Sequence, residues 1–353
     1  MHSPTPMICA ALTAAALGQA TPANAQEFYA GKIISMSTHT APGGGYDTYL
    51  RLLARHLPRH IPGRPSLMVV NLPGAGGLLA LNHAGRVAPQ DGTFLTLVSQ
   101  GLLVHEATGQ PGMQVSLRDF QWIGNLSQSN IVTVTWHASG IATLDDAKVR
   151  DVTVGSTGAG SISVQVPNLL NTVFGTRFKI IYGYKGGAEM NLAMARGELH
   201  GRGANTWASY KVSSPAEVSD HRLNVLTQIG LRKDPDLPHT PLLNDMVAGD
   251  AVYEPIARFM SLSLTITRPL AAPPGVPEER VRILRRAFDA TMKDTAFLAE
   301  AEKLGCEIDP MSGGDVQQAV MQVMATPRDV IERTQAIIAG RALGVPTAIG
   351  ASQ

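Results

Sequence analysis

The chain has 353 residues, with 29 Lys and Arg against 28 Asp and Glu, so its formal net charge at pH 7 is only +1. This balance, with no basic cluster interleaved with aromatic residues, argues against nucleic acid or an anionic membrane surface as partner and favours a small molecule. A chain of this length with 44% hydrophobic residues can build two domains without covalent cross-links.

Residues 1–25 have the pattern of a secretory signal peptide. They contain no Lys, Arg, Asp or Glu, hold an apolar core from Met7 to Leu17, and end in Ala23-Asn24-Ala25. We expect cleavage after Ala25 and a mature chain in the periplasm. Cys306 is the only cysteine beyond that point, so we expect no internal disulfide and a stability that comes from the core.

A glycine-rich turn follows the first predicted strand. Ile33 to Ser37 is a short apolar stretch that predicts a strand, and Leu50 and Leu53 begin a helical spacing after it. Between them lies Thr40-Ala41-Pro42-Gly43-Gly44-Gly45-Tyr46-Asp47. Its glycines expose consecutive N–H groups where a helix leaves its first donors unpaired. Such a turn either serves chain geometry alone or receives an anion.

The same arrangement recurs, which favours the anion-binding interpretation. Ser66 to Asn71 predicts a strand that runs into Pro73-Gly74-Ala75-Gly76-Gly77, and Thr93 to Val98 predicts one that runs into Ser99-Gln100-Gly101. Strands that alternate with helices indicate a parallel sheet, and ligands of such sheets bind beyond the carboxyl ends of the strands. We therefore expect these three loops to converge at one edge.

A second α/β domain is predicted from residue 130 to 258. Strands are expected at 131–136, 151–154 and 179–182, and the last two run into Gly155 to Ser161 and into Gly183-Tyr184-Lys185-Gly186-Gly187. Residues 26–129 and 259–345 are expected to form the first domain. Two domains that point helix N-termini at a common space form a cleft that can close on a ligand.

The later part of the chain is predicted to be mainly helical. Leu223 to Leu231 and Met260 to Thr267 alternate enough to predict strands, the second of which returns the chain to the first domain. Helices are expected at about 277–292, 297–304, 316–324 and 329–340.

Arg202 stands among small residues in His200-Gly201-Arg202-Gly203-Ala204-Asn205-Thr206-Trp207. Glycine at this density lets another group approach closely, and a guanidinium there can bind a carboxylate bidentately. The alternative is a surface arginine paired with a nearby acid.

The spacings of common catalytic and metal sites are missing. The sequence has no phosphate-binding G-x-x-x-x-G-K-[ST] and no G-x-S-x-G nucleophile elbow. Pro58 separates His56 from His60, so we expect solvated histidines at a helix end and no zinc site. Cys306 has no base beside it and is expected to be a buried apolar residue. We expect a binding protein with no metal or cofactor; a secreted enzyme acting on a small acid is the alternative.

Several motifs in a fixed order carry a family resemblance: Ala41 to Asp47, Asn71 to Gly77, Pro89 to Gly92, Tyr184-Lys185-Gly186, and the run from Pro273 to Gly313. Together they resemble the Bug receptors, the solute-binding proteins of tripartite tricarboxylate transporters. The resemblance implies a periplasmic binding protein type II-like fold, with two α/β domains around a ligand cleft. It also implies a receptor that captures a small carboxylate and delivers it to membrane subunits of a secondary transporter. The alternative is a ligand-sensing partner of a two-component system, acting on a sensor kinase. We expect the protein to be a monomer.

The resemblance also implies which positions hold the carboxylate, namely the first glycine-rich loop and loops of the second domain. Carried onto this sequence they are Pro42, Gly43, Gly44, Tyr46, Gly76, Thr157, Gly158, Ser161, Tyr184 and Lys185, to which we add Gly45, Asp47 and Ser99 from the same loops. Relatives that take amino acids tend to have an Asp where this chain has His200 to Asn205 without an acid. Arg202 in that stretch implies a second anionic group, hence a di- or tricarboxylate or an aromatic acid.

Overall fold

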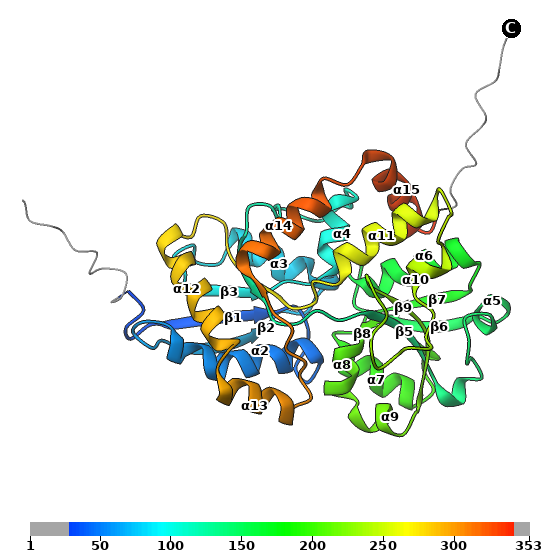
Figure 1. The fold of residues 1–353 in the computed structure, drawn as a ribbon, viewed down its shortest axis with the longest axis horizontal. Coiled ribbons are helices and arrows are strands. Elements are labelled where there is room, and N and C mark those ends of the chain that lie inside the picture. The colour runs from blue at the N-terminus through cyan, green and yellow to red at the C-terminus, as the bar shows by residue number, and fades with distance from the viewer. Residues whose placement is uncertain (1–27, 342–353) are drawn as a thin grey trace, which may run out of the picture.

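The computed structural model describes residues 28–341, so the predicted signal peptide and the tail after Gly344 lie outside the described residues. Within 28–341, no helix combines the length and the apolar character that crossing a bilayer requires. The described chain forms two mixed sheets that lie side by side in Figure 1. We call each sheet with its covering helices a lobe, the first lobe being built on the sheet that contains the N-terminal strands.

The sheet of the first lobe has the strand order β11-β4-β10-β3-β1-β2. β1 pairs in parallel with β2 and β3, as the alternation of strands and helices predicted. β10 is antiparallel to β3 and β4, so the sheet is mixed and not wholly parallel. The strands are β1 (Ile33–Thr38), β2 (Ser66–Asn71), β3 (Phe94–Leu97), β4 (Gln121–Asn125), β10 (Pro269–Ala272) and β11 (Met311–Ser312).

The sheet of the second lobe has the strand order β7-β6-β8-β5-β9. β6 is parallel to β7 and β8, and β5 runs antiparallel between β8 and β9. The predicted strands are present, and the stretch around Arg202 is a further strand at the centre of the sheet. The strands are β5 (Ile131–Trp136), β6 (Val152–Ser156), β7 (Phe178–Tyr182), β8 (Gly201–Thr206) and β9 (Leu223–Ile229).

Helices cover both sheets (Figure 1). The helices are α2 (Gly45–His56), α3 (Leu78–Arg86), α4 (Gly101–Ala107), α5 (Asp146–Val149), α6 (Ile162–Phe174), α7 (Gly187–Ala195), α8 (Trp207–Ser213), α9 (Pro215–Ser219), α10 (Leu243–Met246), α11 (Tyr253–Leu264), α12 (Glu278–Thr291), α13 (Thr295–Lys303), α14 (Gly313–Met324) and α15 (Arg328–Ile338), with short 3-10 turns η1 (Leu57–His60), η2 (Ala75–Gly77) and η3 (His137–Ser139).

The core is divided between the two lobes and their junction. On one face of the first sheet, Leu50 and Leu53 of α2 pack with β1, β3 and α12 in a buried cluster. A larger cluster continues from the other face through α11 into the second lobe and includes Met260 and Val166. The last helix, α15, packs against α6, and the Asn168 side chain donates to the Ile338 carbonyl at 2.7 Å. The C-terminal helices therefore contact both lobes, α14 packing against β4 of the first and α15 against α6 of the second.

The strand predicted at Met260 to Thr267 is wrong, because most of this stretch belongs to helix α11. Its alternation of apolar residues and serines suggested a strand, yet Ile256, Phe259 and Met260 are buried at helical spacing. Ser263 is also buried, and its hydroxyl donates to the Phe259 carbonyl one turn earlier at 2.8 Å. Serines that bond within the helix can lie on its buried face, so the polar positions did not mark the solvent side.

Candidate ligand-binding site

The glycine-rich turn between β1 and α2 is held from behind by the Asp47 carboxylate. Asp47 accepts hydrogen bonds from the Gly43 amide at 3.0 Å, from Arg51 at 2.9 Å and from Asn71 at 2.9 Å. Burial alone would raise the pKa of Asp47, but these hydrogen bonds outweigh it and lower the pKa. Because its oxygens serve the loop, Asp47 shapes the turn from inside the first lobe.

The start of α2 is left open toward the space between the lobes. Gly44 is the N-cap residue of α2 and makes no side-chain cap hydrogen bond. Gly44, Gly45 and Tyr46 line a pocket that also receives residues of the second lobe. The first N–H groups of an uncapped helix carry partial positive charge, so this end of α2 favours an anion.

Two helices of the second lobe begin at the same pocket. Ser161 caps α6 by accepting a hydrogen bond from the Ser163 amide at 3.1 Å, and both residues line the pocket. Gly187, the first residue of α7, also lines it, and its N-cap Gly186 provides no side-chain cap. The positive ends of three helices, α2, α6 and α7, therefore meet at one place.

The pocket is small, and most of the side chains that line it are of polar residues. Its cavity volume is about 60 Å³, which is room for several waters or a small ligand. Both lobes contribute to the lining, which consists of His39, Thr40, Gly44, Gly45, Tyr46, Ser99, Gln100, Thr157, Ser161, Ile162, Ser163, Gly187, Met190, Arg202, Ala204, Asn205, Ser209 and Ser213. This lining contains no Asp or Glu.

Arg202 is the charged residue of the pocket wall. It is 5% exposed, donates to the Asn191 side chain at 2.8 Å and lies over the Tyr210 ring at 5.3 Å. Its Nε has no hydrogen-bond partner, and no carboxylate within residues 28–341 forms an ion pair with it. Burial lowers the pKa of Arg202, but a guanidinium starts so high that it stays protonated.

The position of Arg202 concentrates positive charge. A Cβ added to Gly187 would lie 3.2 Å from one guanidinium nitrogen of Arg202, so the guanidinium lies beside the first residue of α7. A cation next to the positive end of a helix is unfavourable unless an anion lies near both. The pocket thus has the electrostatics of an anion site.

Other buried polar atoms of the pocket keep unused hydrogen-bonding capacity. His39 Nδ1, Thr40 Oγ1 and Asn205 Nδ2 have no partner in the described protein, and all three residues line the pocket. Buried polar atoms are normally paired, so this concentration makes the pocket a candidate site for a polar ligand. Burial lowers the pKa of His39 to about 4, so its imidazole is neutral at pH 7 and adds no charge.

The structure brings half of the predicted site residues together. Gly44, Gly45, Tyr46, Ser99, Thr157, Ser161 and Arg202 line the pocket. The other seven do not line it. In the first glycine-rich loop, Asp47 lies behind the turn, and Pro42 and Gly43 are exposed at the tip of the turn. Gly76 and Gly158 lie in the contact between the lobes, Tyr184 packs against the second-lobe core, and the Lys185 side chain is exposed. A role of any of these residues in binding stays a prediction.

Sequence reasoning missed several residues of the wall. His39 directly precedes the first glycine-rich loop, and Gln100 directly follows Ser99. The pattern that predicted these loops could therefore also have predicted these two residues. Tyr46 donates a hydrogen bond to Gln100, which fixes both side chains at the pocket. The sequence does not distinguish Asn205 and Ser209 from other polar residues. They reach the pocket only because β8 pairs with β5 and because α8 begins there.

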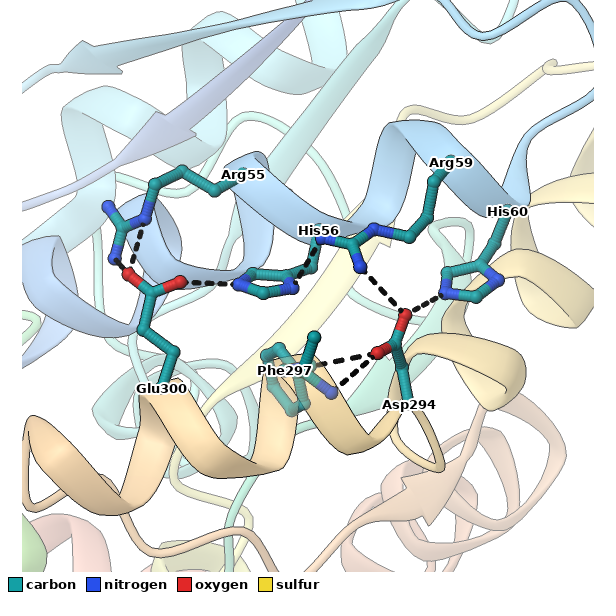
Figure 2. A network of polar contacts seen from close by, with 8 residues as sticks. Arg55, His56, Arg59, His60, Asp294, Phe297 and Glu300 are labelled. Atoms are coloured by element: carbon teal, nitrogen blue, oxygen red, sulfur yellow. Dashed lines mark hydrogen bonds and ion pairs between the residues drawn. The ribbon is translucent and has the colours of Figure 1, made fainter.

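The histidines His56 and His60 lie at the other end of α2, and the prediction that both are solvated was wrong. His56 is buried and bonds Glu300 of α13 at 2.5 Å, and His60 bonds Asp294 at 2.8 Å. Figure 2 shows Arg55 and Arg59 completing the network. These polar contacts fasten α2 to α13, away from the glycine-rich turn.

Fold and pocket together define a class of protein. Two mixed α/β lobes around a polar pocket are the arrangement of periplasmic binding proteins, and solved structures of that kind resemble this chain. The periplasmic binding protein BugD has a TM-score of 0.68 at 18% identity, covering 88% of this chain and 97% of that one. MatC from Rhodopseudomonas palustris with bound malate gives 0.67 at 17% identity, with 87% and 99% covered. A protein of R. palustris with adipate gives 0.67 at 20% identity, with 86% and 97% covered.

The family follows from the sequence comparison. The model of the tripartite tricarboxylate transporter family receptor matches residues 51–343, so the chain belongs to this family of solute-binding proteins. A relative from Agrobacterium vitis, named as the UPF0065 protein in the TAR-I ttuE-ttuC' intergenic region, is 24% identical over 322 residues, covering 89% of this chain and 84% of that protein. The predicted family resemblance and fold class are confirmed, and so is the prediction that the protein is not an enzyme.

Proposed function

We propose that this receptor works in the periplasm and binds a small dicarboxylate in the pocket between its lobes. It then delivers the ligand to the membrane subunits of a tripartite tricarboxylate-type transporter. The observation that carries the proposal is Arg202, a buried guanidinium at the pocket wall with no carboxylate partner within the described residues. A buried charge without a partner is costly, and an anionic ligand removes that cost.

The positive charges at the pocket can receive two carboxylate groups of one ligand. One is received by the uncapped start of α2, where Gly44 and Gly45 present backbone N–H groups. The other meets Arg202 at the start of α7, in the second lobe. An amino acid fits less well, because the lining offers no acid for its ammonium group.

The solved relatives support this ligand class by analogy. The structures of two R. palustris proteins contain malate and adipate, which are both dicarboxylates. The cavity of about 60 Å³ favours a short dicarboxylate over a long one.

A thermal-shift panel of mono-, di- and tricarboxylates on the mature protein tests the proposal, because a ligand that binds only the folded state raises the melting temperature. Calorimetry on the compounds that raise it gives the affinities. We expect dicarboxylates to bind more tightly than their monoamides. No shift with any carboxylate would contradict the proposal.

The contribution of Arg202 is tested by Arg202→Met and Arg202→Lys, with Arg177→Met as the control. Arg177 is an exposed arginine of the second lobe that donates to the Val149 carbonyl. We expect Arg202→Met to weaken dicarboxylate binding at least tenfold, the order of a lost charge-assisted hydrogen bond, and the lysine variant to recover part of it. The control keeps wild-type affinity. Unchanged affinity in Arg202→Met would remove the basis of the proposal.

Delivery to a transporter is tested by uptake of the labelled ligand in cells with and without the gene for this protein. We expect uptake to require the receptor. Binding in vitro without any dependence of uptake on the receptor would contradict the transport role and favour a sensory one.

A further inference from the structure

A second buried arginine, Arg268, lies at the hinge between the lobes. Within residues 28–341 the chain passes between the two sheets at 126–130 and at 265–268, and the two crossovers pair at Gln128 and Ile266. The Arg268 amide donates to the Asn125 side chain at 2.8 Å, and its carbonyl accepts from the Leu126 amide at 3.2 Å. The backbone of Arg268 is thus fixed where the lobes turn relative to each other.

The side chain of Arg268 contacts both lobes. It is fully buried, and its guanidinium lies 4.2 Å from the ring centroid of Tyr46 and 4.9 Å from that of Tyr49, both on α2 of the first lobe. One of its nitrogens donates to the hydroxyls of Ser209 at 2.5 Å and Thr206 at 3.1 Å in the second lobe. Closing the lobes therefore encloses this guanidinium between them.

The charge of Arg268 is not matched inside the described protein. No carboxylate of residues 28–341 forms an ion pair with it, and its Nε has no hydrogen-bond partner. The guanidinium also donates to the Thr267 carbonyl at 2.7 Å. Hydroxyl groups, a carbonyl and aromatic faces stabilise a cation only in part, and burying a charge without a counter-charge is costly. Tyr46 and Ser209, which contact the guanidinium, also line the pocket. The guanidinium therefore lies directly behind the wall of the ligand pocket, where an anion can be held.

We infer that Arg268 is a positioning residue that couples closure of the lobes to the negative charge of the ligand. Closure removes water from Arg268, and an anion in the pocket offsets the cost of enclosing the cation. A neutral ligand of the same shape does not offset the cost of enclosing the cation, so the lobes stay mostly open when it is bound. The inference rests on the proposed function for the sign of the ligand charge, but the cost of closing over Arg268 exists without any ligand.

The experiment measures closure directly by energy transfer between dyes on the two lobes. Val87 and Val149 are 70% and 67% exposed, one in each lobe, and are replaced by cysteine for labelling, while the buried Cys306 is replaced by alanine. The variants are Arg268→Gln and Arg268→Met, which are neutral, and Arg268→Lys, which keeps the charge. Gln keeps a side-chain N–H donor and Met keeps an apolar side chain of similar length, and the melting temperature of each variant shows that it is folded before closure is measured.

Arg280→Gln is the matched control. Arg280 also lies over an aromatic ring, with 3.6 Å to the Phe28 centroid, and it donates to the Asp91 carbonyl at 2.7 Å, away from the pocket. Its replacement removes a comparable contact without touching the hinge.

The probes are succinate and its monoamide succinamate, which differ by one negative charge at nearly the same shape. Without ligand, we expect the neutral variants to populate the closed state several-fold more than the wild type, and the lysine variant to resemble the wild type. With ligand, we expect the preference for succinate over succinamate to fall about tenfold in the neutral variants, which corresponds to about 1.4 kcal/mol. Arg280→Gln changes neither quantity.

A lower melting temperature with unchanged closed population and unchanged ligand preference would show a merely structural role and overturn the inference. If the neutral variants close more readily while no carboxylate binds the wild type, the cost of closing over Arg268 is supported and the proposed dicarboxylate function is wrong. The two proposals therefore fail separately.

Discussion

Replacing Gly76 by alanine should block closure of the lobes without removing any side chain from the pocket wall. Gly76 has a φ of +70°, and a Cβ there would lie 2.8 Å from the Gly160 carbonyl carbon and closer still to the Ser161 nitrogen. These are backbone atoms of the other lobe, so they cannot move aside as a flexible side chain would. Because non-bonded carbon atoms need about 3.5 Å, the lobes have to separate by roughly 1 Å at this point.

That separation breaks two hydrogen bonds between the lobes. The Gly76 amide donates to the Thr157 carbonyl at 3.0 Å, and the Gly160 amide donates to the Ala75 carbonyl at 3.2 Å. At about 1 kcal/mol for each bond, the closed state loses about 2 kcal/mol relative to the open state. If the ligand binds only the closed state, its dissociation constant rises about 30-fold.

The control is Gly175→Ala. Gly175 has a φ of +71°, but a Cβ added there would meet no atom of the described residues within 4 Å. Both variants should lose about 1–2 kcal/mol of unfolding free energy from backbone strain, seen as similar falls in melting temperature. Calorimetry with succinate should show weakened binding only in Gly76→Ala. Equal affinities in the two variants would refute the reasoning.

Two further predictions concern pH and the far end of α2. Burial lowers the pKa of His39 from 6.5 to about 4, so the unfolded chain takes up the proton first as pH falls through this window. Stability should therefore fall with pH, by at most about 3 kcal/mol, and urea unfolding of His39→Gln should show a shallower loss. Glu300→Gln should lower the melting temperature, since it removes the negative charge from the contacts with His56 and Arg55 (Figure 2), but calorimetry should find ligand affinity unchanged.

Local patterns were enough to predict the strand-turn-helix units. Ser66–Asn71 and Ile131–Trp136 have the bounds that their composition suggested, because each is a short apolar stretch ended by polar or turn residues. The glycine-rich turns were predictable for the same reason, since Gly43, Gly76 and Gly158 take positive φ values that other residues rarely adopt.

Features that depend on distant partners were not predictable. β10 has four residues with two alanines and is a strand only because it is inserted between β3 and β4. Arg268, which directly precedes it, has no motif around it, and its importance comes from contacts with α2 and with Ser209. The glycine neighbours of Arg202 are visible in the sequence, but only the folded structure shows that it has no acidic partner among the described residues.

In the proposed binding mode, the two buried arginines divide the recognition of an anion into separate tasks. Arg202 lies in the wall, where a ligand group can meet it directly, so its removal should change affinity for a particular carboxylate. Arg268 lies outside the wall, between Tyr46 and Ser209, and acts on the ligand only through the field and through closure. Backbone N–H groups at helix starts accept any carboxylate. Selectivity for the number of charges must therefore come from the arginines, and selectivity for shape from the small cavity that the closed lobes leave between them.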